Sequence, residues 1–194
     1  MDGLPPDLQL LADEYAAVRV EFEELTAGWT EAQGAWRENE HSWSVAEHLE
    51  HLAMTGWAYL SAMDVVADRA RAEGKVRRGP AKPGFGGRLF GRMMEPPVRP
   101  FLKFKAPKII VPVNAPPVSE ALAHFTEMDG AAKEFLVRNA DTELNSVVFK
   151  SPFAASVSFS VASGLNILAT HSRRHLWHAR RVREAGERVH FGRS

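Results

Sequence analysis

The sequence predicts an all-α protein, a four-helix bundle with a long, basic, Pro/Gly-rich crossover between the second and third helices. Two observations support this prediction. In four separate segments, apolar residues recur at spacings of three or four, which is the period of an amphipathic helix. Nine of the twelve prolines fall within residues 74–118, so that stretch cannot hold another long helix. The length of 194 residues suits one domain over residues 1–194, with 74–118 as an insertion.

The first predicted helix follows Pro5 and Pro6 and ends at Gly28, a helix-terminating residue. Its buried stripe is spaced 3, 4, 3, 4 and 3 and consists of Leu8, Leu11, Tyr15, Val18, Phe22 and Leu25. Such a regular stripe is typical of a helix in a bundle.

The second predicted helix runs from Ser44 to about Ala72, and Gly74 stops it. Ser44 and Glu47 form a capping-box pattern, so we interpret Glu47 as part of the helix start rather than as a catalytic carboxylate. Glu47 nevertheless shares a helix face with His51, and we retain it as a residue of the outer shell of a site. We expect His48 to pack on Trp43, which precedes the cap, rather than to bind metal.

His51 lies in a row of small residues on this helix, with Thr55, Ala58 and Ala62. Small side chains beside an imidazole leave room for a ligand or for water. His51 is therefore the best candidate on this helix for a metal ligand.

Residues 74–118 carry ten Lys or Arg residues and a single acid, Glu95. We predict one short helix over 86–95 and an extended piece over 108–112. The segment is expected to form a positively charged flap beside the site, with Arg77, Arg78, Arg88 and Arg92 as anion-binding candidates. The alternative is that these cations only pair with acids elsewhere on the surface.

A third helix is predicted to start at Ser119 as its N-cap, with a buried stripe formed by Leu122, Phe125, Met128, Ala132 and Phe135 or Leu136. Residues 141–158 are expected to be irregular because Asn145, Ser151 and Pro152 interrupt them. The last helix is predicted from Ser158 or Ser160 to Gly186.

The last helix carries an unusual stripe in which Leu168, His171, His175, His178 and Val182 follow at spacings of 3, 4, 3 and 4. Histidines thus occupy positions where a bundle normally places Leu or Ala. Buried imidazoles need a partner for each ring nitrogen, and a metal ion satisfies several at once. A histidine-rich helix end that faces solvent is the alternative.

Composition narrows the function. The formal net charge is zero, so the whole molecule does not indicate a polyanionic partner, and nucleic acid is not favoured. The chain has no cysteine, which excludes disulfides and protein thiolates as ligands or nucleophiles. No signal peptide or transmembrane run is evident, so we expect a cytoplasmic protein.

Two segments resemble signatures of the DinB/YfiT-like superfamily. Residues 43–52 (WSVAEHLEHL) are similar to the signature that opens the second helix, and His171 and His175, with three residues between them, are similar to the closing signature. The order and spacing of the helices also match, so the resemblance covers nearly the whole chain. The insertion at 74–118 is outside the minimal pattern. His178 stands where many members have Gln, so it belongs either to the outer shell of the site or to the ligand set.

This resemblance implies a bundle that holds a divalent metal ion, Zn, Ni or Fe, on His51, His171 and His175. Characterised relatives are transferases or isomerases that use a low-molecular-weight thiol, and some are metal hydrolases. Three imidazoles with an open position are typical of a catalytic rather than a structural site. Because the chain lacks cysteine, a sulfur nucleophile must come from outside.

Three functions therefore remain in view. The first is a metal-dependent enzyme, either a thiol transferase or a hydrolase, acting on a small, anionic molecule. The second is a non-catalytic metal-binding or ligand-sensing bundle. The third is a binder of anions or nucleic acid through the basic segment. We also expect a homodimer, because Trp57, Tyr59 and Trp177 lie off the predicted core stripes and are then either pocket walls or interface anchors.

Overall fold

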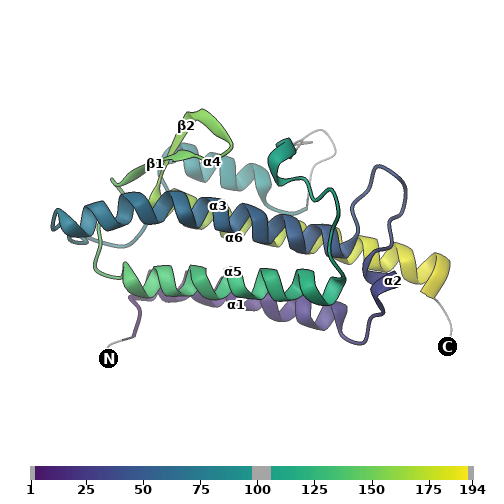
Figure 1. Ribbon diagram of the computed structural model, residues 1–194. Coiled ribbons are helices and arrows are strands. Elements are labelled where there is room, and N and C mark those ends of the chain that lie inside the picture. The colour runs from purple at the N-terminus through teal and green to yellow at the C-terminus, as the bar shows by residue number, and fades with distance from the viewer. Residues whose placement is uncertain (1–2, 98–105, 192–194) are drawn as a thin grey trace.

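Four long helices pack side by side in the computed structural model, which describes residues 3–97 and 106–191 (Figure 1). These helices are α1 (Pro6–Thr26), α3 (Val45–Ala72), α5 (Val118–Arg138) and α6 (Val161–Gly186). Helix α3 packs against α5 and α6, and α1 packs against the same two helices. The protein is thus mostly helical, as predicted, and the two helices that carry the candidate histidines, α3 and α6, are neighbours.

The start of α3 is fixed as its sequence predicts. The Ser44 hydroxyl accepts a hydrogen bond from the Glu47 backbone N–H at 3.2 Å, and the Glu47 carboxylate accepts one from the Ser44 N–H at 2.8 Å. Two donors that the first helical turn leaves open are thereby satisfied. The helix ends just before Gly74, which has a positive φ of 66° that suits glycine.

The start of α5 differs from the prediction. The helix begins at Val118 with Pro117 before it, and Ser119 is not its N-cap. A short helix that we did not predict, α2 (Glu31–Gly34), supplies the cap instead. The Glu31 carboxylate accepts hydrogen bonds from the Val118 N–H at 2.6 Å and the Ser119 hydroxyl at 2.8 Å.

The insertion contains one short helix, α4 (Phe85–Met94), close to the predicted span, and it packs on α6. The prediction of an extended piece at 108–112 was wrong, because Lys108–Ile110 form a single 3₁₀ turn, η1. In Figure 1, α4 and η1 lie on the same side of the long helices. Part of the insertion, residues 98–105, lies outside the described residues.

The expectation of irregular structure over 141–158 was also wrong. Strands β1 (Val148–Ser151) and β2 (Ala154–Ser160) form an antiparallel hairpin in which Phe149 pairs with Phe159. The hairpin leads directly into α6, whose N-cap is Ser160. Past Gly186 the chain adds one π-helical turn, η2 (Glu187–Phe191). None of the helices in the described ranges is long and apolar enough to cross a bilayer.

Candidate metal centre

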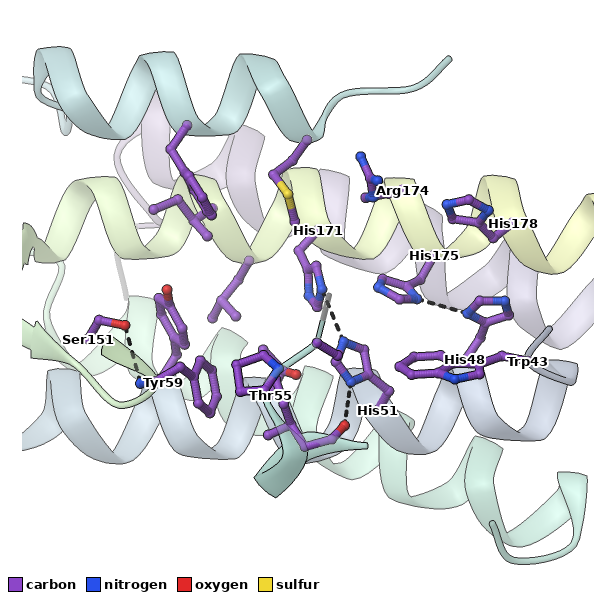
Figure 2. A pocket seen from close by; sticks show the side chains of 18 of the residues that line it. Trp43, His48, His51, Thr55, Tyr59, Ser151, His171, Arg174, His175 and His178 are labelled. Carbon is purple, nitrogen blue, oxygen red and sulfur yellow. Dashed lines mark hydrogen bonds between the residues drawn. The ribbon is translucent and has the colours of Figure 1, made fainter. Parts of the chain in front are cut away.

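Three buried histidines converge between α3 and α6. His51 comes from α3, and His171 and His175 come from successive turns of α6. One ring nitrogen of each lies within 4.8 Å of the others (Figure 2). The structure therefore brings together the three residues that were named as metal ligands, and this trio is able to hold one ion.

A backbone carbonyl fixes the tautomer of His51. Its Nδ1 lies 2.6 Å from the carbonyl oxygen of Ile110 in η1. A carbonyl oxygen only accepts hydrogen bonds, so Nδ1 carries the hydrogen and Nε2 keeps its lone pair. The lone-pair nitrogen faces Nε2 of His171 at 3.3 Å. A carbonyl behind the ring and a lone pair in front of it is the usual arrangement for a histidine that binds metal.

His48 plays the corresponding part for His175. The Nδ1 atoms of the two rings lie 2.9 Å apart, so one donates to the other. When His175 is the donor, its Nε2 lone pair is free to bind metal. His48 also lies against Trp43, as predicted, with ring centroids 5.5 Å apart. Sequence reasoning missed its contact with His175, although His48 precedes His51 by one helical turn and shares its face.

The histidines of the cluster are held neutral. Burial, reinforced by neighbouring imidazoles, places the pKa of His171 and of His175 well below the usual value, and burial also lowers the pKa of His51. Neutral imidazole is the form that binds metal. Three neutral nitrogen donors fit Zn, Ni or Fe, and the residues present thus suit the group that the resemblance implies.

The two outer residues named from the sequence, His178 and Glu47, have different partners. His178 stacks on His48, with ring centroids 5.7 Å apart, and its ring lies 6.2 Å from that of His175. The Glu47 carboxylate is held by the Arg37 guanidinium at 2.6 and 2.7 Å and by the helix cap. Arg37 was not singled out in the sequence.

A cavity of about 900 Å³ opens beside the trio. Its wall includes Tyr59 and Trp177, two of the aromatics that were predicted to line a pocket or an interface, whereas Trp57 is exposed on the surface. The hairpin and the insertion complete the wall, with contributions from Phe90, Met94, Ile110, Phe153, Val157 and Phe159. The insertion therefore borders the cavity through α4 and η1.

Thr55 provides a polar group in this wall. It lies one turn beyond His51 and is buried, and its hydroxyl has no hydrogen-bond partner in the described part of the chain. A buried hydroxyl is rarely left unsatisfied, so a molecule in the cavity is its natural partner.

The four anion-binding candidates do not line this cavity among the described residues. Arg77 forms an ion pair with Asp7, and its backbone N–H donates to the Asp141 carbonyl. Arg88 and Arg92 are exposed on α4, and Arg78 lies in the loop before it. The described cations that do line the cavity are Arg174 and Arg181, both on α6.

Sequence comparison agrees with this geometry. A family model described as the DinB superfamily matches residues 14–179, which span α1 through most of α6. No curated protein and no solved structure gave a significant match. The match extends over well more than half of the chain and includes all three converging histidines, and the protein therefore belongs to the DinB superfamily.

Proposed function

We propose that this protein is a metal-dependent enzyme built on a four-helix bundle, with one divalent ion held by His51, His171 and His175. The observation that carries the proposal is the hydrogen bond from His51 Nδ1 to the Ile110 carbonyl, which leaves Nε2 turned toward His171. A cavity of about 900 Å³ beside the trio gives a small molecule access to it.

When bound, the ion supplies a Lewis acid that lowers the pKa of a coordinated water or thiol toward neutrality. The chain's own residues prepare the place. Ile110 and His48 orient the rings of His51 and His175, and the cavity wall around them is mostly apolar. The Thr55 hydroxyl is placed to hydrogen-bond a substrate at the cavity side of His51.

The reaction is either transfer to a low-molecular-weight thiol or hydrolysis. Without cysteine in the chain, sulfur chemistry requires an external thiol. The metal-loaded protein should therefore be assayed for thiol addition to an electrophile and, without thiol, for cleavage of esters, amides and phosphoesters. Activity that remains after complete removal of metal would contradict both forms of the proposal.

A metal-binding sensor is the second candidate, because the same histidines and cavity would also serve ligand binding without turnover. A sensor would bind metal and a small molecule but release that molecule unchanged. Product analysis of the same assays separates the two.

A further inference from the structure

The cavity is chemically divided along α6. On the N-terminal side of the histidines its wall contains Ile167 and Leu168, and facing them are aromatic rings of α4 and the hairpin. Toward the C-terminal side it contains Arg174, which lies between His171 and His175, and then His178 and Arg181. Figure 2 shows this order, with Tyr59 and Ser151 on one side of the trio, Arg174 beside His171 and His175, and His178 on the other side.

The polar side of the wall is positively charged. It carries two guanidinium groups, and no Asp or Glu is found among the described residues that line the cavity. Arg174 is buried, with 7% of its surface exposed. Arg181 lies over the ring of Trp177, 4.8 Å from its centroid, which holds that guanidinium at the wall.

Other arginines of α6 meet carboxylates outside the cavity. Arg173 pairs with Glu14 and Glu95, Arg180 with Glu21, and Arg183 with Glu187. These four carboxylates thus pair with cations that do not line the cavity. A divalent ion on the histidines would add further positive charge to the same space.

An anionic ligand would offset this charge. Guanidinium groups bind carboxylate and phosphate through paired hydrogen bonds, and these are strongest where water is excluded. Arg174 follows His171 by three residues, about one helical turn, so an anion bound there lies close to the trio. The opposite side of the cavity is lined mainly by apolar and aromatic side chains, with Tyr59 and Ser151 among them, which favours a largely hydrophobic body.

We propose that the cavity binds an anionic amphiphile, with its carboxylate or phosphate on Arg174 and Arg181 and its apolar body between α4 and the hairpin. The claim that this amphiphile is the substrate rests on the proposed function. The claim that the cavity binds it does not, since both arginines belong to the chain and need no metal. The bond that reacts would lie between the two ends, next to the histidines.

The test is calorimetric titration of the full chain, in metal-free and metal-loaded form, with octanoate, octyl phosphate, octan-1-ol and acetate. We expect octanoate or octyl phosphate to bind at least about 10-fold more tightly than octan-1-ol and acetate, in both forms of the protein. The stronger of the two anions identifies the headgroup. Binding of octan-1-ol as tight as that of both anions would overturn the proposal.

Variants locate the anion. Arg174→Gln and Arg181→Gln should each weaken binding of the preferred anion by about 5- to 10-fold and leave octan-1-ol binding unchanged. Arg180→Gln, on the same helix but paired with Glu21, is the matched control and should bind like the unaltered protein. If Arg174→Gln does not fold, the exposed Arg181 decides the question. Unchanged anion binding by Arg181→Gln and by any folded Arg174→Gln would overturn the proposal.

Metal content measured on the same samples separates the two claims. Anion binding without metal binding would contradict the proposed function and leave the arginine site standing. Metal binding without a preference for anions would contradict the arginine site and leave the proposed function standing.

Discussion

Hydrogen bonds to Nδ1 of His51 and of His175, the ring nitrogens that are not directed at the metal position, determine whether Nε2 of each ring can bind metal. The Ile110 carbonyl selects the tautomer of His51, and His48 contacts the outer nitrogen of His175. Such contacts hold the ring in place and raise its basicity as a ligand. His48 is therefore a positioning residue, and His178, stacked on it, supports it from one step further away.

Substitution of these two outer histidines should weaken metal binding in order of their distance from the trio. His48→Ala removes the partner of His175 and should weaken metal affinity by roughly 10- to 100-fold, the range typical of such contacts. His178→Ala should have a smaller effect, because its ring touches His48 and lies 6.2 Å from the His175 ring. Chelator competition measures both. A loss for His178→Ala equal to that for His175→Ala would instead make His178 a ligand.

The depressed pKa values predict acid sensitivity of the metal-free protein. Burial lowers the pKa of His178 to about 4 and moves those of His48, His171 and His175 well below the ordinary value. Below about pH 6.5 these histidines therefore become protonated in the unfolded chain but stay neutral in the folded state. The free energy of unfolding of the metal-free protein thus falls as the pH falls.

We expect the melting temperature of the metal-free protein to drop by roughly 5 °C or more between pH 7.5 and 5.5, since 1 kcal/mol corresponds to about 2–4 °C in a chain of this size. His124→Gln is the control, because His124 is only partly buried and its pKa is raised by the Glu50 carboxylate, so it should leave the drop in place. A melting temperature that does not change between pH 7.5 and 5.5 would show that the histidines of the cluster are not buried in the neutral form.

At the scale of elements, α4 is held close to α6 by a glycine. A Cβ at Gly87 would lie 2.4 Å from Oγ and 2.5 Å from Cβ of Ser163, whereas one at Gly86 would meet nothing within 4 Å. The Ser163 hydroxyl also accepts a hydrogen bond from the Gly84 N–H at 3.0 Å. The helix brings Phe90 and Met94 to the cavity, so this close approach shapes the site.

Gly87→Ala should therefore destabilise the protein by about 1–3 kcal/mol, the usual cost of overpacking. Gly86→Ala should be neutral or stabilise by up to about 1 kcal/mol, because alanine favours the helix. Urea unfolding compares the two. Equal stability of both variants would mean that α4 does not rest on α6 as described.

Helices with a regular stripe and a start signal were predictable, and elements that depend on distant contacts were not. The capping box of Ser44 and Glu47 forms within one helical turn, so both partners can be recognised in a short stretch of sequence. The start of α5 depends on Glu31, which is 87 residues away from Val118, and no local pattern reveals it. The hairpin did leave a signal, since Phe149 and Phe159 each lie in short runs of β-forming residues around the turn at Pro152.

For the whole molecule, the features of the site that depend on local sequence were predictable, and those that depend on distant contacts were not. The trio was predictable because α6 presents its histidines at helical spacing and because both short signatures match a family. The charge of the cavity was not, because it depends on which arginines of α6 face the acids of α1 and which face inward. The basic insertion drew attention to Arg77, yet folding pairs that residue with Asp7.

We expect the protein to form a symmetric homodimer, with Trp57 in the interface, because this large ring on α3 is 40% exposed. Sedimentation should give twice the chain mass, and Trp57→Ser should shift the protein toward monomer. Leu10→Ser, at an apolar position on α1 that is 61% exposed, is the control and should remain a dimer. Unaltered protein that sediments as a monomer at all concentrations would remove this prediction.

The most direct test of the metal centre is elemental analysis of untagged protein, with His51→Ala prepared in parallel. We predict about one divalent ion per chain in the unaltered protein and at least a 10-fold lower content in the variant, because His51 is the only one of the three ligands that α3 contributes. A His51→Ala protein that still binds one full equivalent would contradict the three-histidine site.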